Sequence, residues 1–298
     1  MDKLIIIGNG FDIAHGLKTD YKYFLSQLTE QHRKFYETVC QYIPEDALWS
    51  SFEKSLAYLD DEQLQEDNSC YLLGYGDENW RDSAHHDFQY MIGQALDFAP
   101  DIPFYFSEWI NTINTNVPPI ISTHIISPSN LFLSFNYTDT LERVYGIPAD
   151  RILYLHGKAS RGDTLILGHH DNTLFQDEAT PEFKTEEERD FFYENYSEDV
   201  RVLEAKEIIK SYFKETYKDT ASIIESYNYF FRSLNNIKEI YIYGHSLSFI
   251  DFDYFVEIKE HTSLTCQWYI SYHSEDDFYN AKNFINALNL NYYQLFQF

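Results

Sequence analysis

The sequence has few cysteines and no long apolar run. Its three cysteines, Cys40, Cys70 and Cys266, are far apart and odd in number, so they form neither a disulfide framework nor a Cys-x-x-Cys zinc ribbon. A membrane-spanning helix needs roughly eighteen consecutive uncharged apolar residues, and the chain has no such stretch. Asp2 and Lys3 precede the first apolar run without a secretory pattern. We therefore expect a cytoplasmic protein that does not span a membrane.

Basic residues are also scarce. The chain of 298 residues has 22 Lys and Arg against 48 Asp and Glu, which gives a formal net charge of −26. A field of this sign repels phosphate backbones, so broad nucleic-acid binding is not expected. A nuclease-type effector is a weak alternative, because no clustered Asp/Glu-x-Lys site for a catalytic metal is present. The pair His169 and His170 does not indicate a metal site either, since neighbouring residues on a strand point to opposite faces.

Apolar strand-like runs alternate with helix-like segments along the chain. A continuous apolar run closed by glycine, as in Leu4–Ile7, is typical of a buried parallel strand. Further strands are expected at Leu131–Phe135, Ile152–Leu155, 164–170, Ile240–Tyr243 and 264–274. This alternation predicts an α/β fold, with a Rossmann-like, mostly parallel sheet and helices on both faces. No Pro/Gly/Ser-rich linker divides the chain, so we expect one domain over 1–298 with helical insertions at about 40–120 and 174–235.

The first predicted strand runs into the sequence GNGFD. Gly8 and Gly10 allow a sharp turn and a close approach of the backbone to a ligand, and the start of a following helix can bind phosphate. Ile13 stands where the third glycine of the dinucleotide-binding fingerprint would be, and the Gly-Lys-Ser/Thr of a P-loop is missing. Two interpretations of the glycines stay open, a phosphate-binding loop and a tight turn.

Two other polar residues directly follow predicted strands. Asn136 comes after LFLSF, at a place where α/β enzymes put working side chains. The alternative is that Asn136 or Asp139 caps the next helix. His156 follows ILYL and precedes Gly157. It is either a general base or a structural hydrogen-bonding residue.

The fourth motif, YGHSLSFIDFDYF, follows the strand expected at Ile240–Tyr243. Its Gly-His-Ser resembles the nucleophile elbow of serine hydrolases, but Ser248 replaces the second glycine of that elbow. A serine hydrolase is therefore disfavoured. Ser246 and Asp251 are better interpreted as residues that line or cap a ligand-binding loop.

The order of the motifs is more specific than any one of them. LIIIGNGFDIAHGLKTDY, FNYTDTLE, LYLHG and YIYGHSLSFIDFDYF follow one another over most of the chain. In this order they resemble the AbiH family of bacterial abortive-infection proteins, and they are more remotely similar to sirtuin-like NAD-binding domains. The resemblance implies that the chain is an antiphage effector whose single domain has a sirtuin-like α/β fold.

The similarity to sirtuin-like domains also implies a set of site residues. It makes Asn136 a catalytic residue beside the nicotinamide ribose and His156 the catalytic base. It places the glycine turn on the dinucleotide phosphates and the YGHSLSFID loop on the adenosine side. The cofactor-binding residues implied in this way are Gly8, Asn9, Gly10, Phe11, Asp12, Gly244, His245, Ser246 and Asp251.

The implied reaction is cleavage of NAD at its nicotinamide glycosidic bond. NAD would be the substrate or ligand, and no further cofactor or metal is required. Thr138 stands where the relatives carry Asp, so a binding module that senses NAD or a related nucleotide without turnover is the alternative. Protein deacetylation is not expected, because the zinc ribbon of deacetylating sirtuins is missing. The helical insertions are open to two roles, a homo-oligomer interface or a restraint on activity, and the sequence does not identify the phage trigger.

Overall fold

The computed structural model of the protein describes residues 2–122, 124–176, 185–190 and 198–298, and these residues form two compact units. The sheet unit consists of Met1–Gln31, Pro103–His170 and Lys218–Phe298, and the helical unit of His32–Ile102 and Asp171–Tyr217. The expected insertions at about 40–120 and 174–235 therefore overlap the helical unit, but their C-terminal parts belong to the sheet unit.

The sheet unit is built on one six-stranded sheet whose strands are all parallel. Its spatial order is β3-β2-β1-β4-β5-β6, which confirms the predicted Rossmann-like α/β fold. The strands are β1 (Lys3–Ile7), β2 (Leu131–Ser134), β3 (Ile152–Tyr154), β4 (Glu239–Tyr243), β5 (Gln267–Tyr272) and β6 (Tyr293–Gln297). The chain changes direction across the sheet between β1 and β4, so this pair of strands forms the topological switch point.

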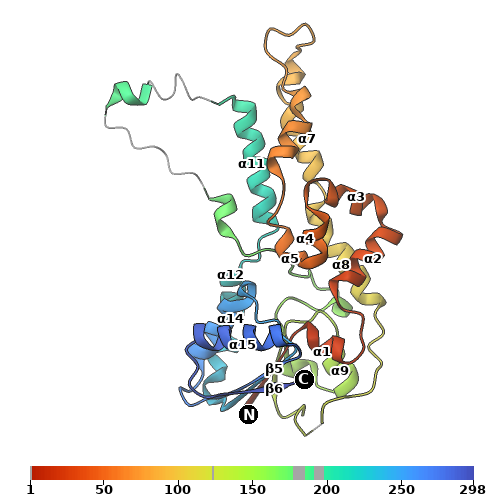
Figure 1. Cartoon of the computed structure of the whole chain (residues 1–298), viewed down its shortest axis with the longest axis vertical. Helices are drawn as coiled ribbons and strands as arrows, with labels where there is room; N and C mark the ends of the chain where they lie inside the picture. Colours follow the sequence, from red (N-terminus) through yellow and green to blue (C-terminus); the bar gives the residue numbers. More distant parts are fainter. Residues whose placement is uncertain (1, 123, 177–184, 191–197) are drawn as a thin grey trace. The chain divides into compact units, whose positions relative to one another are not determined.

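Helices cover both faces of this sheet, which is why the first strand is apolar throughout. Leu4 and Ile6 pack into a core with residues of α14 and α15, whereas Ile5 and Ile7 pack with residues of α1 and α9 on the other face. Figure 1 shows α14 and α15 together on one side of this unit and α1 and α9 on the other. A strand buried on both faces reads as a continuous apolar run. The helices of this unit are α1 (Asn9–Ala14), α2 (Tyr21–Gln31), α8 (Ile102–Thr112), α9 (Thr140–Tyr145), α12 (Thr220–Ser226), α13 (Asn228–Arg232), α14 (Phe252–His261) and α15 (Glu275–Ala287).

Two details of the predicted sheet are wrong. The expected strand at 164–170 does not form, and only His169 makes an isolated bridge. This segment leaves the sheet after a turn at Gly162, so its backbone finds only scattered partners such as the bond from Ile166 N to His156 O. The prediction also missed β6. This edge strand is half exposed and lacks the continuous apolar pattern of a buried strand.

The helical unit has its own packing. The helices are α3 (Arg33–Tyr42), α4 (Glu45–Ser50), α5 (Phe52–Ser55), α6 (Asp61–Asp67), α7 (Asp87–Leu96) and α11 (Val200–Glu215). Helices α7 and α11 pack against each other, and the Tyr212 hydroxyl of α11 donates to the carbonyl of Leu56 at 3.0 Å. The stretch expected to be a helical insertion at about 174–235 contains α11, α12 and α13, whereas 177–184 and 191–197 lie outside the described residues.

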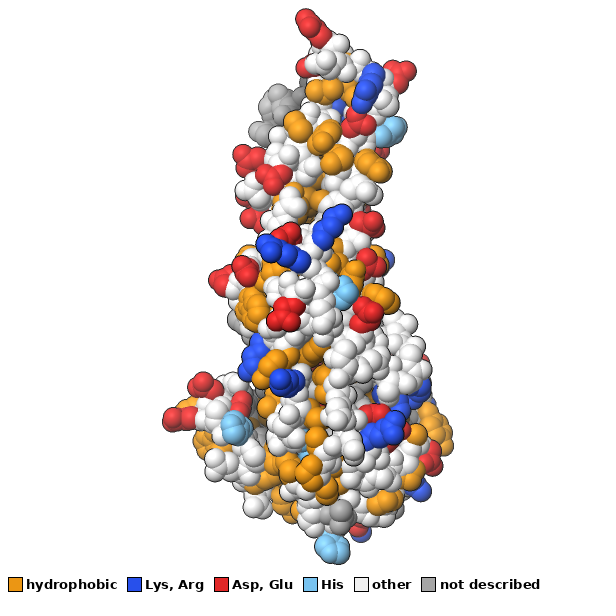
Figure 2. Space-filling view, turned by 90° about the vertical axis from the view of Figure 1, so that its right-hand side faces the viewer, with side chains coloured by type: hydrophobic (Ala, Val, Ile, Leu, Met, Phe, Trp, Pro, Cys, Tyr) orange, Lys and Arg blue, Asp and Glu red, His pale blue; other side chains and the backbone are white. Residues whose placement is uncertain are grey.

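Figure 2 shows the charged side chains on one face of the molecule. On the face drawn in Figure 2, acidic and basic side chains are interspersed, and the described residues of that face form no broad basic patch. Within the described ranges, none of the helices combines the length and apolar character that a bilayer crossing requires.

Candidate functional site

The candidate site lies where the strands of the sheet unit end. Ile7 of β1 is in register with Ser134 of β2 and with Tyr243 of β4, so these three strands end at the same level. Ser134 is in turn in register with Tyr154 of β3. The turns that carry the glycine pair, Asn136, His156 and the YGHSLSFID loop therefore all leave the sheet at one edge, where open α/β sheets bind ligands.

The glycine pair makes a close contact, and its partner is protein backbone. The amide of Gly10 donates to the carbonyl of Gly244 at 2.7 Å. A Cβ atom added at Gly10 would lie 2.8 Å from Gly244 Cα, and one added at Gly8 would lie 2.6 Å from His245 Cα. Gly244 itself has a positive φ of 60°. The turn after β1 and the loop after β4 thus touch at the switch point, and only glycine fits there.

A buried carboxylate follows the glycine turn. Asp12 is 1% exposed, and its Oδ2 accepts a hydrogen bond from the Thr138 hydroxyl at 2.6 Å. Burial raises the pKa of Asp12 to about 6, against the lowering effect of Thr138, Thr140 and Asn136 and with a smaller contribution from the charge of Asp139. The Oδ1 atom of Asp12 lacks a hydrogen-bond partner of good geometry. Thr138, where the resemblance implies Asp, thus binds a carboxylate supplied by α1.

Asn136 lies in the same cluster with its side chain unsatisfied. The Ser134 hydroxyl bonds to the backbone N–H and C=O of Asn136, but neither polar atom of the Asn136 side chain has a hydrogen bond of good geometry. The residue is 4% exposed. Buried polar groups without partners are rare, because each costs roughly 1–3 kcal/mol. The capping alternative is not supported either, since α9 begins after Asp139 without any side-chain cap.

A second buried cluster surrounds Asp251. Its Oδ1 lies 3.5 Å from Lys218 Nζ and 3.8 Å from His156 Nε2, and its Oδ2 lies 3.5 Å from His245 Nε2. All four residues are buried. The ring of Phe135, next to Asn136 in sequence, packs against both histidine rings at centroid distances of 5.4 and 4.4 Å. The implied base His156 and the loop residues His245 and Asp251 are therefore brought together.

The protonation states in this cluster follow from its contacts. Burial, assisted by the charge of Lys218, lowers the pKa of His156 to about 3, so its ring is neutral at neutral pH. For Asp251, burial alone would raise the pKa, but Lys218 and His245 outweigh it and hold the carboxylate ionised. The N–H of Leu247 donates to His245 Nδ1 at 2.9 Å. Because Nδ1 accepts this bond, the ring proton of His245 is on Nε2, the atom that faces Asp251.

The loop that holds this cluster has an unusual backbone. Leu247 has a φ of 55°, a left-handed conformation that bulky residues rarely adopt. Such strain persists only where the surroundings fix it, and it is concentrated at functional sites. Here the bond from Leu247 N to the ring of His245 is one of those fixing contacts. The strained loop keeps His245 in place beside Asp251.

The remaining predicted site residues take different positions. Phe11 is part of the apolar core, whereas Asn9 and Ser246 are exposed. Asn9 donates from its side chain to the carbonyl of Thr19 at 2.9 Å. Of the adjacent histidines, the Nε2 atom of His170 lies 3.5 Å from an Asp253 oxygen. Among the described residues, no group of three or more His, Cys, Asp or Glu side chains could hold a metal ion.

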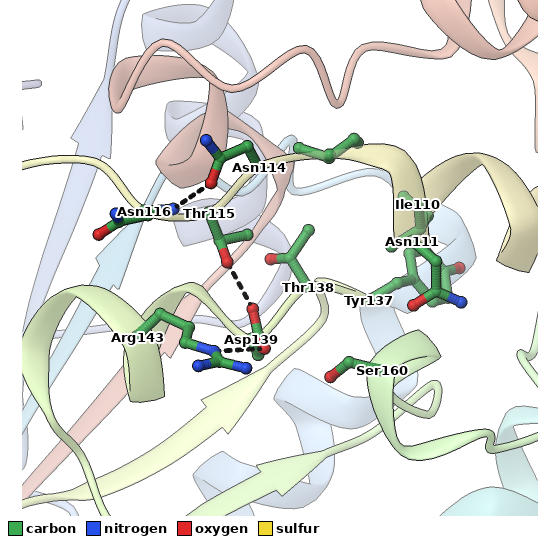
Figure 3. A pocket seen from close by; sticks show the side chains of 11 residues that line it. Ile110, Asn111, Asn114, Thr115, Asn116, Tyr137, Thr138, Asp139, Arg143 and Ser160 are labelled. Atoms are coloured by element: carbon green, nitrogen blue, oxygen red, sulfur yellow. Dashed lines mark hydrogen bonds and ion pairs between the residues drawn. The ribbon is translucent and has the colours of Figure 1, made fainter.

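An open polar cavity adjoins the Asp12 cluster (Figure 3). It has a volume of about 580 Å³, within the usual range for small-molecule sites. Its polar lining includes three amides, three aliphatic hydroxyls and one ion pair: Asn111, Asn114, Asn116, Thr115, Thr138, Ser160, Asp139 and Arg143. In Figure 3, Asp139 lies between Thr115 and Arg143, to which it is joined at 2.7 and 3.2 Å. Thr138 thus contacts Asp12 and also lines the cavity.

Two parts of the site were missed by sequence reasoning. Lys218 stands in a polar segment between helices, and no local pattern distinguishes it from a surface lysine. Its place beside Asp251 depends on the path of the chain, where Lys218 N donates to the carbonyl of His169 at 2.7 Å. The run from Asn111 to Asn116 gave a better signal, because it places five amide and hydroxyl side chains at and after the end of an apolar helix.

Comparison with known proteins identifies the family. The family model described as Bacteriophage abortive infection AbiH matches residues 4–272, which include β1 to β5 and every turn of the candidate site. The chain belongs to the AbiH family. This membership assigns it to abortive-infection defence against bacteriophage. Among curated proteins and among solved structures, no match to this AbiH chain was found.

Proposed function

We propose that this AbiH protein acts in phage defence by binding NAD at the carboxyl edge of its sheet and cleaving the nicotinamide glycosidic bond. The observation that carries the proposal is the side chain of Asn136, which is buried after the end of β2, lies near enough to Asp12 to lower its pKa, and has no hydrogen bond of good geometry. A ligand with ribose hydroxyls supplies the hydrogen bonds that this amide lacks, which offsets the cost of burying it.

The topology supports a dinucleotide as the ligand. The order β3-β2-β1-β4-β5-β6 is that of dinucleotide-binding Rossmann folds, in which the ligand lies across the carboxyl ends of the strands at the switch point. The Gly10–Gly244 contact occupies the space directly between the two turns. The diphosphate would therefore lie outside this contact, and the exposed Asn9 and Ser246 are the residues available to meet it.

The chemistry fits the groups that surround the cavity. When the bond between ribose C1′ and the nicotinamide nitrogen breaks, its electron pair stays on the nicotinamide, which leaves as a neutral molecule. The ribose passes through an oxocarbenium-like transition state. Water then bonds to C1′ and gives up one proton, so the products are nicotinamide, ADP-ribose and H⁺. Asn136 orients the ribose or the attacking water, while His156 and His245 keep the neighbouring loop in position.

Incubation of the purified protein with NAD, followed by chromatography for free nicotinamide, tests this proposal. We expect release by the wild type and a loss of at least a hundredfold in Asn136→Ala, since positioned groups contribute this much to such reactions. The substitution removes a polar side chain that has no hydrogen bond of good geometry, so the melting temperature should not fall.

The same assay separates turnover from binding. If NAD raises the melting temperature of the wild type but no nicotinamide appears, with or without phage lysate, the protein is a nucleotide sensor and not a hydrolase. If NAD neither raises the melting temperature nor is consumed, the proposed ligand is wrong.

A further inference from the structure

We propose that Asp12 accepts the proton of the reaction through the hydroxyl of Thr138, which joins the buried carboxylate to the polar cavity. This inference rests on the proposed function and names a proton path for the same site. It differs from the role implied by family resemblance, in which His156 is the base.

Two hydroxyls and one carboxylate define the path, those of Thr138, Thr140 and Asp12. The single proton of the Thr138 hydroxyl points to Asp12 Oδ2, because this O–O distance is 2.6 Å and the carboxylate can only accept. Thr140 Oγ1 lies 2.9 Å from Thr138 Oγ1 and is the donor in any bond between these two hydroxyls, because the Thr138 proton is directed to Asp12. One lone pair of Thr138 remains, and Thr138 is part of the cavity lining. A water or ribose hydroxyl in the cavity can donate to this lone pair.

Proton transfer along this path conserves atoms and charge without any other reactant. The donor in the cavity passes its proton to Thr138 Oγ1 as Thr138 passes its own proton to Asp12 Oδ2. The oxygen of the donor, if it is water, becomes bonded to ribose C1′. Asp12 then holds one additional proton, which returns to solvent after the product leaves, and Thr138 regains its original state.

His156 is less suited to this task by position. Asp12 and His156 are both buried and neither lines the cavity, but Asp12 is bonded to the lining residue Thr138. In contrast, His156 Nε2 has no hydrogen bond of good geometry and lies 3.8 Å from Asp251. Its lowered pKa also makes it a weak base. Asp12, whose pKa is raised to about 6, is closer to the optimum for accepting a proton at neutral pH.

The pH response of Asp12 depends on the titratable groups around it. Asp139, on the turn after β2, faces it and is paired with Arg143 of α9 at 3.2 Å. The charge of Asp12 contributes to raising the pKa of Tyr154 of β3. On its own helix, His15 is held by the carbonyl of Phe11 and by the Tyr145 hydroxyl, both at 2.7 Å. Of these groups, only the Asp12 carboxylate is bonded to Thr138.

Nicotinamide release measured from pH 4.5 to 8.5 in matched variants tests the path. Wild-type kcat should fall as pH drops through about 6, because the protonated carboxyl cannot accept. Asp12→Asn and Thr138→Val should each lower kcat on the order of a hundredfold. The residual activity of these variants should no longer fall as the pH drops through about 6. Thr138→Ser keeps the hydroxyl, so its kcat should stay within a few-fold of the wild-type value and should show the same fall at low pH. Thr220→Val is the control, since it removes a similar 2.6 Å hydroxyl–carboxylate bond, to Asp253, away from the cavity.

The outcomes distinguish this inference from the proposed function. A wild type that releases no nicotinamide overturns the proposed function and this inference with it. An active wild type whose fall in kcat at low pH persists in Asp12→Asn overturns the proton path alone. Equal losses in Thr138→Val and Thr220→Val would also overturn it, because the effect would then be structural. If Asp12→Asn fails to fold, the comparison of Thr138→Val with Thr138→Ser still decides.

Discussion

At the scale of single residues, the site is a set of buried polar groups with incomplete hydrogen bonding. Asp12 of α1 and Asn136, which follows β2, each have side-chain atoms without a partner of good geometry. In contrast, Asp251 is surrounded by Lys218 and two histidines. The first pair therefore offers the contacts that a ligand can complete, whereas the second cluster holds the loop after β4 in place.

Stability should depend on pH through Asp12. Its pKa of about 6 in the folded protein is above the ordinary value of 3.8, so the folded state keeps the proton to higher pH than the unfolded state does. The associated stability is present at low pH and is lost as pH rises from about 4 to beyond 6. Asp12→Asn removes this dependence while keeping an acceptor for Thr138. Between pH 5 and pH 8, the free energy of unfolding of the variant relative to the wild type should rise by about 1.4 kcal/mol.

Denaturant unfolding of both proteins at the two pH values measures this change. The second variant, Thr220→Val, supplies the baseline, since its effect on stability should be nearly the same at pH 5 and pH 8. A difference between wild type and Asp12→Asn that stays constant with pH would show that Asp12 does not titrate in this range.

At the scale of elements, the two turns at the switch point depend on each other. The turn after β1 and the loop after β4 are joined by the bond from Gly10 N to Gly244 O. No side chain fits between them, because the nearest atoms to an added Cβ belong to backbone. The glycines are thus needed for the fold itself, and loss of NAD binding in a glycine variant would not by itself place the diphosphate at this turn.

Gly10→Ala should destabilise the protein by about 1–3 kcal/mol, the usual cost of overpacking a tight site. Gly74→Ala is the control, because nothing lies within 4 Å of its added Cβ, and its effect should stay within about 0.5 kcal/mol. Thermal unfolding followed by circular dichroism compares the two. Equal, small effects would mean that the turns can move apart freely.

The sequence predicted the central strands of the sheet better than the site at their carboxyl ends. The strand at Leu4–Ile7 was evident because a strand covered on both faces must be apolar throughout. Strand β6 was missed, since an exposed edge strand has no such requirement. Lys218 was missed for a different reason. Its burial depends on contacts with distant residues, and local sequence carries no sign of them.

The glycine motif was also predictable only in part, because its contacts are with distant residues. Its close backbone approach was predictable from the residue type, whereas the atoms that approach it were not, because Gly244 is 234 positions away. The bond between Asp12 and Thr138 also joins distant positions. A parallel sheet brings together residues that follow different strands, so such pairs become visible only once strand order and register are known.

At the scale of the whole molecule, the family and the fold restrict the function. Membership in the AbiH family assigns the chain to abortive infection, and the sheet has the strand order of dinucleotide-binding folds. The net charge of −26 disfavours broad contact with nucleic acids. The proposed anionic ligand therefore needs local groups to receive it, such as Arg143 and the amides that line the polar cavity.

A structure of the protein with ADP-ribose tests the central claim most directly. We expect the terminal ribose within hydrogen-bonding distance of the Asn136 side chain and of the Thr138 hydroxyl, with the diphosphate across the carboxyl ends of β1 and β4. ADP-ribose bound elsewhere on the chain, with the Asn136 amide still without a partner, would contradict the account.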